Sequence, residues 1–284
     1  MSINGKTKII AIFGDPVEHT LSPAMHNAAF AATGIDCVYV PFHVRPDNLG
    51  DAVRGLKAMG FAGANITVPH KESVIKFLDG VDVEAGRLGA VNTIVNEGGA
   101  LIGYNTDGRG FVRSLKEEGG LDPDGKRVFV CGAGGAARGI GFALSSAGAA
   151  EISFFDVDKA KLGRLVDDIN GAFGRTVAVA AGLDPDYIKE RGLVVNATPL
   201  GMHAGDPRPL PDGSFREGQI VYDIIYNPAV TVTMRQAEGA GARVQNGLGM
   251  LLYQGVLAFE HWMGVAAPVE TMREALLKGL QAKG

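Results

Sequence analysis

Residues 127 to 139 read RVFVCGAGGAARG, an apolar run that leads directly into a glycine-rich turn and then into a helical pattern. This order of strand, turn and helix is the setting that the dinucleotide-binding fingerprint requires. Gly132 permits the tight turn, Gly134 lets the backbone approach a pyrophosphate, and Ala137 keeps the helix close to the strand. The stretch predicts a Rossmann-type domain whose helix N-terminus binds phosphate, and the alternative is a tight packing turn without a ligand.

Strand-like and helix-like segments alternate on both sides of this stretch. Upstream, we expect strands at residues 8–14, 37–44 and 64–69 and helices at 22–33 and 46–59, with Ser22 as N-cap and Pro23 in the first turn. Two short strands around Glu97-Gly98-Gly99 predict a hairpin. Downstream, strands are expected at residues 151–156, 175–180, 193–199 and 219–226, before two long helices from Leu248 onward. This alternation is typical of an α/β fold with mostly parallel sheets.

The length allows two domains of moderate size. The chain has 284 residues, of which 46% are hydrophobic and 20% are charged. We expect an N-terminal, mostly parallel α/β substrate domain formed by residues 1–107 and 246–284, and a Rossmann-type dinucleotide-binding domain formed by residues 108–245.

Composition argues against several classes of partner. The net charge is −4 and no Lys/Arg-rich block occurs, so neither nucleic acid nor an acidic membrane surface is expected. Cys37 and Cys131 are far apart in apolar contexts, which fits a reducing cytoplasm. No apolar run is long enough for a signal segment or a membrane span, and the six histidines lack metal-type spacing. We therefore expect a cytoplasmic protein with a small-molecule ligand and no metal.

Polar side chains cluster where predicted strands end. They are Thr20 and Ser22, Thr67 and Lys71, Asn92, and Asn105, Thr106 and Asp107. Ligands of open α/β sheets bind beyond the carboxyl ends of the strands, so these groups can share one crevice. Hydroxyls, an amide, an ammonium and a carboxylate would suit a small polyhydroxy acid. Taken singly, each has a plainer explanation as a helix cap, a turn former or a solvated charge.

Eight motifs, in order and spacing, resemble those of shikimate dehydrogenases. They are GDPVEHTLSPAMHN, GANITVPHKE, GAVNT, NTDGRGF, GAGGAARG, NATPLGM, DIIYNP and NGLGMLLYQ, and they span nearly the whole chain. The resemblance implies a two-domain enzyme, with the cleft between the domains, that reversibly oxidises shikimate to 3-dehydroshikimate with a nicotinamide cofactor in the route to aromatic amino acids. It allows a monomer or a homodimer.

The resemblance also implies roles for individual residues. Lys71 and Asp107 match the catalytic pair of the family. The substrate contacts it implies are Thr20, Ser22, Thr67, Asn92, Tyr226 and Gln254, with the Thr20 and Ser22 hydroxyls on the substrate carboxylate. The cofactor contacts it implies are Gly132, Ala133, Gly134, Gly135 and Ala136 at the pyrophosphate, Thr198, and Ile224, Gly247 and Met250 near the nicotinamide.

The turn after the strand at residues 151–155 bears on the choice between NAD and NADP. Asp156 and Asp158 lie where an acidic residue commonly binds the ribose hydroxyls of NAD, and a carboxylate there would repel a 2′-phosphate. NADP-dependent members typically have Asn-Arg-Thr at this turn, whereas this chain has Asp156-Val157-Asp158. The sequence therefore favours NAD over NADP. Two observations oppose this: Lys159 and Lys161 are near enough to help bind a phosphate, and Asp158 could simply cap the next helix.

Two other functions stay open at this point. Thr20 stands where the family often has Ser, and its extra methyl group could alter the choice between shikimate and quinate. An NAD-dependent quinate dehydrogenase is therefore the first alternative. The second is a nicotinamide-binding regulatory protein that has lost catalysis.

Overall fold

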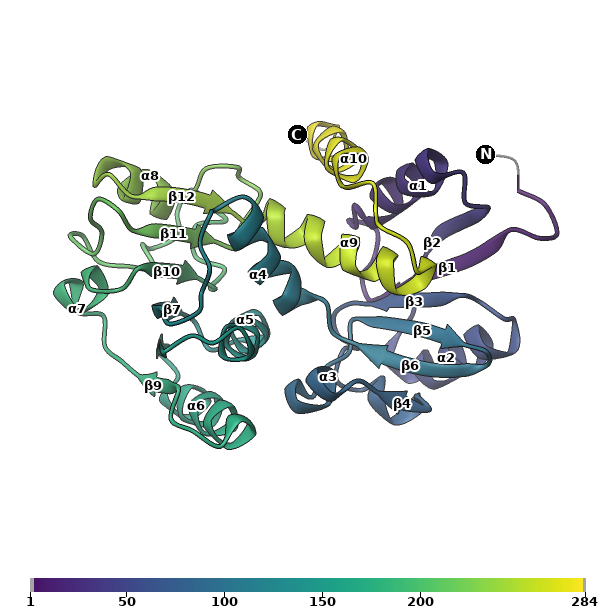
Figure 1. Ribbon diagram of the computed structural model, residues 1–284, viewed down its shortest axis with the longest axis horizontal. Helices are drawn as coiled ribbons and strands as arrows, with labels where there is room; N and C mark the ends of the chain where they lie inside the picture. Colours follow the sequence, from purple (N-terminus) through teal and green to yellow (C-terminus); the bar gives the residue numbers. More distant parts are fainter. Residues whose placement is uncertain (1–2, 283–284) are drawn as a thin grey trace. The chain divides into compact units, whose positions relative to one another are not determined.

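The computed structural model describes residues 3–282, and the chain divides into two compact units. Unit 1 is formed by Met1–Thr106 and Leu252–Gly284, and unit 2 by Asp107–Leu251. Each unit is built around one sheet with helices on its faces (Figure 1).

The sheet of unit 1 has six strands in the order β2-β1-β3-β5-β6-β4. Their bounds are β1 Lys8–Gly14, β2 Cys37–His43, β3 Gly63–Ile66, β4 Gly80–Val81, β5 Thr93–Glu97 and β6 Ala100–Tyr104. The first three run parallel, whereas β5 is antiparallel to both β3 and β6. The predicted hairpin is confirmed: β5 and β6 pair across Gly98 and Gly99, which both adopt positive φ. The reversal at β5 brings its amino end to the edge where β3 and β6 have their carboxyl ends.

Helices cover both faces of this sheet. They are α1 Ser22–Thr33, α2 Leu49–Ala58, α3 Val83–Leu88, α9 Leu248–Met263 and α10 Val269–Gln281, with short 3-10 turns at Pro46–Asn48 and Ile75–Phe77. Leu49, Val53 and Leu56 of α2 pack on one face. On the other face, α1 packs against α9, where the rings of Phe30 and Phe259 stack at 5.5 Å. Helices α1, α9 and α10 thus form one layer (Figure 1).

The N-cap of α1 differs from the prediction by one residue. Ser22 is the first helical residue rather than the N-cap, which is Leu21, and no side chain caps the helix. The Ser22 N–H instead donates to Thr20 Oγ1 at 3.2 Å. The prediction that Ser22 is the N-cap was therefore wrong, because Leu21 already has helical dihedral angles.

The sheet of unit 2 is parallel throughout and has the strand order β12-β11-β10-β7-β8-β9. The strands are β7 Arg127–Cys131, β8 Glu151–Phe155, β9 Ala178–Ala180, β10 Leu193–Asn196, β11 Ile220–Asp223 and β12 Arg243–Asn246. The order reverses between β7 and β10, which is the doubly wound arrangement of dinucleotide-binding domains. Sequence reasoning missed β12, a four-residue edge strand with a single apolar residue, Val244.

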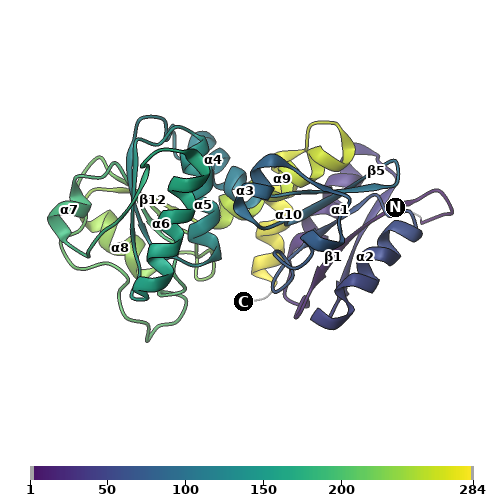
Figure 2. The same ribbon diagram turned by 90° about the horizontal axis from the view of Figure 1, so that it is seen from below.

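Helices lie on both faces of this second sheet. They are α4 Asp107–Glu117, α5 Gly135–Ser146, α6 Lys159–Phe173, α7 Pro185–Lys189 and α8 Val232–Gly239. Figure 2 shows α5 and α6 on one side of the sheet and α7 and α8 on the other. Ile188 of α7 and Ala237 of α8 pack with Phe129 and Val194 in one buried cluster. This layered packing fixes the carboxyl ends of β7 and β10 next to each other.

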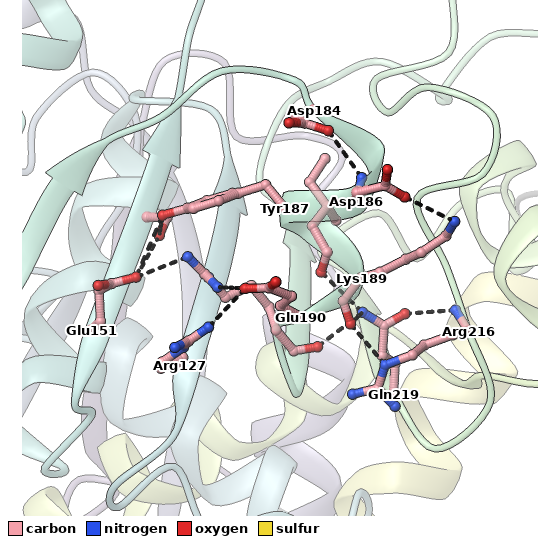
Figure 3. A network of polar contacts seen from close by, with 12 residues as sticks. Arg127, Glu151, Asp184, Asp186, Tyr187, Lys189, Glu190, Arg216 and Gln219 are labelled. Atoms are coloured by element: carbon pink, nitrogen blue, oxygen red, sulfur yellow. Dashed lines mark hydrogen bonds and ion pairs between the residues drawn. The ribbon is translucent and has the colours of Figure 1, made fainter.

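A polar network lies at the opposite, amino-terminal edge of this sheet (Figure 3). The buried guanidinium of Arg191 stacks on the Tyr187 ring at 3.8 Å and donates to Glu151 at the start of β8, at 3.0 Å. Gln219, just before β11, donates to the backbone oxygen of Arg191 at 2.8 Å. The network joins α7 to the beginnings of the strands, and we assign it a structural role.

None of the helices within residues 3–282 combines the length and apolar character needed to cross a membrane.

Candidate active site

The carboxyl ends of β1 and β3 in unit 1 lie in close contact. A Cβ on Gly14 would lie 2.4 Å from Thr67 Cγ2, so Gly14 leaves the space that Thr67 occupies. The Thr67 N–H donates to Phe13 O at 3.0 Å, and the Asp15 N–H donates to Val68 O at 3.1 Å. Strand pairing thus continues beyond β3 and holds Thr67 at the edge of the sheet.

Lys71 lies in a turn that is anchored on two sides. Its backbone oxygen accepts from the Val91 N–H at 2.8 Å, which ties the turn to the residue before Asn92. The fully buried ring of His70 contacts Val44 O through Nε2 at 2.6 Å. Lys71 itself is half-buried, and Glu72 is exposed. His70, for which the sequence suggested no role, therefore fixes the turn that carries Lys71.

Asn92 is buried at the amino end of β5 and is held by its own hydrogen bonds. Its Oδ1 accepts from the Thr106 N–H at 2.8 Å and from the Thr93 hydroxyl at 2.9 Å, and its Nδ2 donates to Thr106 Oγ1 at 3.0 Å. Its backbone oxygen accepts from the Ile66 N–H at 2.8 Å. Asn92 thus joins the ends of β3 and β6, although its own strand runs in the opposite direction.

Gln254, far away in the sequence, belongs to the same unit. A Cβ on its neighbour Gly255 would lie 2.1 Å from the terminal methyl carbon of Met25, so the Met25 side chain of α1 packs directly on this position of α9. Unit 1 therefore contains the predicted site residues Thr20, Ser22, Thr67, Lys71, Asn92 and Gln254.

In unit 2, the glycine-rich loop follows β7 at the point where the strand order reverses. Gly132 has a φ of 114°, and a Cβ on it would lie 2.9 Å from Ala197 O after β10. Its N–H donates to Phe155 O of β8 at 2.7 Å. Gly132 is thus required by the fold itself, because any side chain would strain the backbone and collide with the segment that follows β10.

Gly134 and Gly135 have no such structural requirement. A Cβ on Gly134 would meet only Lys161 Nζ, at 3.7 Å, and a Cβ on Gly135 would meet nothing within 4 Å. The dihedral angles of Gly134, φ −74° and ψ −175°, suit any residue. Packing therefore does not explain these two glycines, whereas the close approach of a ligand at the N-terminus of α5 would. The binding of a phosphate at this loop stays a prediction.

The two acidic residues after β8 behave differently from each other. Asp156 accepts from the Ala133 N–H of the glycine-rich loop at 2.7 Å and from the Asp158 N–H at 2.9 Å. Asp158 caps α6 by accepting from the Lys161 N–H at 3.0 Å. Val157 between them is 86% exposed. Asp158 is therefore the N-cap of α6, as the alternative explanation from the sequence held. Its contact with a cofactor stays a prediction.

Asn196 and Asp223 join the loops that follow β10 and β11, and sequence reasoning missed both. Asn196 Oδ1 accepts from the N–H and the hydroxyl of Thr198, at 3.1 and 2.7 Å. Its Nδ2 donates to Asp223 Oδ1 at 3.1 Å, and Asp223 also accepts from the Ile225 N–H and the Thr231 hydroxyl. Burial raises the pKa of the Asp223 carboxyl, and these donors oppose the rise. The available signal was an acidic residue at the end of an apolar strand.

The remaining predicted contacts of unit 2 surround these loops. A Cβ on Gly247 would lie 1.8 Å from Ile224 O, so the two backbones touch. The Met250 N–H donates to the buried Tyr222 hydroxyl at 3.0 Å. Tyr226 is half-buried, and burial raises the pKa of its hydroxyl. These contacts fix the segments that follow β10, β11 and β12, which carry the predicted residues Thr198, Ile224, Gly247 and Met250.

Asp107 is the half-buried first residue of α4 and belongs to unit 2, whereas Lys71 belongs to unit 1. The next residue, Gly108, lies against α5, because a Cβ there would be 2.5 Å from Gly139 O. This close packing of α4 on α5 holds Asp107 at a fixed position relative to α5, the helix that begins at the glycine-rich loop. The pairing of Lys71 with Asp107 stays a prediction.

Comparison with known proteins shows the family to which the chain belongs. The family model described as the shikimate dehydrogenase substrate binding domain matches residues 12–94, and the one described as the shikimate 5'-dehydrogenase C-terminal domain matches residues 247–277. Shikimate dehydrogenase (NADP(+)) of Moorella thermoacetica is 48% identical over 99% of this chain and 97% of its own length. The chain belongs to the shikimate dehydrogenase family.

Solved structures agree with this membership of the shikimate dehydrogenase family. Shikimate 5-dehydrogenase from Listeria monocytogenes, in complex with shikimate and NAD, matches with a TM-score of 0.91 and 38% identity over 97% of this chain and 98% of that one. Quinate dehydrogenase from Corynebacterium glutamicum, in complex with NAD, matches with a TM-score of 0.89 and 31% identity over 96% and 99% of the two chains. The predicted fold class and family are confirmed.

Proposed function

We propose that this chain is a shikimate dehydrogenase that reversibly interconverts shikimate and 3-dehydroshikimate. The observation that carries the proposal is the set of hydroxyl, amide and ammonium groups at one edge of the unit 1 sheet, in a chain so similar to shikimate dehydrogenases. These groups have the hydrogen-bonding capacity that a hydroxylated carboxylic acid requires. The reaction removes a hydride and a proton from one hydroxyl-bearing carbon and leaves a ketone.

The substrate carboxylate would bind at the beginning of α1. The Thr20 and Ser22 side chains offer hydroxyl hydrogens there, and no side chain caps the helix. The Ser22 N–H already donates to Thr20 Oγ1 and Pro23 has no N–H, so the two hydroxyl groups and the positive end of the helix dipole would favour the negative charge. Thr67, Asn92, Gln254 and Tyr226 would then contact the ring hydroxyls.

Lys71 would handle the proton of the reacting hydroxyl. In ketone reduction its ammonium group donates a proton to the carbonyl oxygen, and in the reverse direction the neutral amine accepts that proton. Asp107 would hold this amino group in place, and its own negative charge is favoured at the N-terminus of α4. Acid–base assistance of this kind contributes about 10² to 10⁴-fold to the rate.

The residues of unit 2 fit a nicotinamide dinucleotide. Gly134 and Gly135 leave open space next to the N-terminus of α5, where a pyrophosphate would accept backbone hydrogen bonds. The bound nicotinamide supplies the hydride acceptor for the reaction. The segments at Thr198, Ile224 and Met250 would border the ring and exclude water from it.

We further propose that the cofactor is NAD rather than NADP. The Asp156 carboxylate is held by two backbone N–H groups, Val157 offers no donor, and Asp158 adds a second negative charge. A 2′-phosphate would meet repulsion here. Lys159 and Lys161 act in the opposite sense, although the Lys159 ammonium donates to Asp156 O at 3.1 Å. The NADP named for the Moorella relative makes this choice worth testing directly.

Quinate is the second candidate substrate. The chain shares its architecture with the quinate dehydrogenase of Corynebacterium glutamicum, whose structure contains NAD. Thr20 places an additional methyl group at the predicted carboxylate site, where quinate and shikimate differ in ring shape. The two substrates have to be compared in one assay.

The test is a spectrophotometric assay with shikimate and quinate, each with NAD and NADP. We expect shikimate with NAD to give the highest kcat/KM. A higher kcat/KM with quinate would make the chain a quinate dehydrogenase, and no activity with either substrate would support the regulatory alternative. Strong preference for NADP would contradict the cofactor proposal.

A variant tests the role of Lys71. We expect Lys71→Ala to lower kcat by about 10²-fold or more while the affinity for the cofactor stays unchanged, because only the proton transfer is lost. Lys278→Ala, at an exposed position on α10, is the matched control and should leave kcat unchanged. Turnover near that of the wild type in a folded Lys71→Ala protein would contradict the assignment.

A further inference from the structure

A series of buried, hydrogen-bonded side chains leads from β2 to the candidate substrate site in unit 1. The Tyr39 hydroxyl donates to Asn65 Oδ1 at 2.7 Å, and Asn65 Nδ2 donates to Asn92 O at 3.0 Å and to Thr93 Oγ1 at 3.2 Å. The Thr93 hydroxyl donates in turn to Asn92 Oδ1 at 2.9 Å. All four residues are buried. The series ends on a side chain that we propose as a substrate contact.

Strand register explains why Tyr39 reaches Asn65. Tyr39 is opposite Ile10 on β1, and Asn65 is opposite Ile12, two residues further along the same strand. Residues two apart point to the same face of a strand. The long tyrosine side chain therefore crosses β1 diagonally on that face to meet the amide.

His26 and Asn27, two residues that have no role in the predicted site, hold Tyr39 in place. Asn27 forms two hydrogen bonds with its backbone: Nδ2 donates to Tyr39 O at 3.0 Å and Oδ1 accepts from the Tyr39 N–H at 2.8 Å. The His26 ring stacks on the Tyr39 ring at 4.6 Å. Burial lowers the pKa of His26 to about 3, so a neutral ring covers the tyrosine. The position of the hydroxyl is thus fixed from both sides.

The direction of each hydrogen bond follows from the partners. Asn92 O is only an acceptor, so the Asn65 amide must turn its nitrogen toward Asn92 and its oxygen toward Tyr39. The Tyr39 hydroxyl must then donate. Burial raises the pKa of Tyr39, so the hydroxyl keeps the proton that it donates to Asn65.

We propose that Tyr39 is a positioning residue for substrate binding: its hydroxyl fixes the Asn65 amide, which in turn holds Asn92 in place. This inference rests on the proposed function, in which Asn92 contacts the substrate. Without the hydroxyl, Asn65 Oδ1 keeps its burial but loses its donor. The amide would then be free to reorient, and Asn92 would lose part of its support.

Tyr39→Phe tests the proposal, because it removes one oxygen atom and keeps the ring that packs on His26. We expect KM for shikimate to rise about tenfold, as suits a buried acceptor that loses its donor, while KM for NAD changes by less than about twofold. Tyr104→Phe is the matched control, since that hydroxyl donates to exposed Glu97 at 2.9 Å in the same sheet. It should leave both KM values unchanged.

A double-mutant cycle with Asn65→Leu separates positioning from a general loss of stability. If Tyr39 acts through Asn65, adding Tyr39→Phe to Asn65→Leu should raise KM for shikimate by less than about twofold further. An unchanged KM in Tyr39→Phe, or equal increases in both KM values, would overturn the inference. A wild-type protein inactive with shikimate would instead overturn the proposed function, so the two failures are distinguishable.

Discussion

Two glycines of the same loop, Gly132 and Gly134, should respond oppositely to alanine. Gly132→Ala introduces a Cβ at a φ of 114°, 2.9 Å from Ala197 O. A residue forced into such a backbone conformation costs about 1–3 kcal/mol, and the contact with a neighbouring strand adds to this. We expect the free energy of unfolding to fall by at least about 2 kcal/mol.

Gly134→Ala should leave the fold intact. Its backbone is extended, and the nearest atom to a new Cβ is Lys161 Nζ at 3.7 Å. Replacing such a glycine by alanine stabilises a protein by about 0.4–1 kcal/mol, because the unfolded chain loses freedom. The methyl group would nevertheless occupy the space that we assign to the pyrophosphate. We expect the dissociation constant for NAD to rise about tenfold or more, equivalent to ~1.4 kcal/mol.

The assays are denaturant unfolding for stability and fluorescence titration with NAD for binding. Gly163→Ala on α6 is the matched control, since a Cβ there meets nothing within 4 Å. It should change neither the affinity for NAD nor the fold. If Gly134→Ala bound NAD as tightly as the wild type does, the assignment of the loop to the pyrophosphate would be refuted.

Three further variants test other parts of the site. Asp156→Asn with Val157→Arg should shift the ratio of kcat/KM values toward NADP by about tenfold or more, measured by steady-state kinetics. Burial raises the pKa of Asp223 in the folded protein, so the wild type should lose stability as the pH rises from the ordinary pKa of a carboxyl group toward this raised pKa. Asp223→Asn should remove that loss, measured by denaturant unfolding at several pH values. Gly108→Ala should lower kcat more than Gly139→Ala, because only the first Cβ meets the facing helix.

Local sequence was sufficient for several elements. β1 and α1 have the predicted bounds, and the glycine pair at residues 98–99 forms the predicted turn. These segments are specified by apolar periodicity and by turn residues, which act over a few positions. The edge strand β12 was missed, because a short strand with one apolar residue has almost no pattern to detect.

The sequence provides candidate residues for the site but not the contacts that support them. Motifs propose Lys71 and Asn92, yet the anchoring of the Lys71 turn by His70 and the reversal of direction at β5 required the structure. The link between Asn196 and Asp223 joins residues 27 positions apart through side-chain atoms. Hydrogen bonds of this kind leave no periodic trace in the sequence.

The sequence by itself determined the family, the two kinds of α/β unit and the residue types available for chemistry, because motifs and apolar periodicity are local properties of the chain. Only the tertiary structure decided which glycines serve the fold and which border open space, and which polar side chains hold one another. Those distinctions depend on distances between atoms far apart in sequence, such as Gly132 to Ala197 and Tyr39 to Asn65. Such distances are set by how the layers pack.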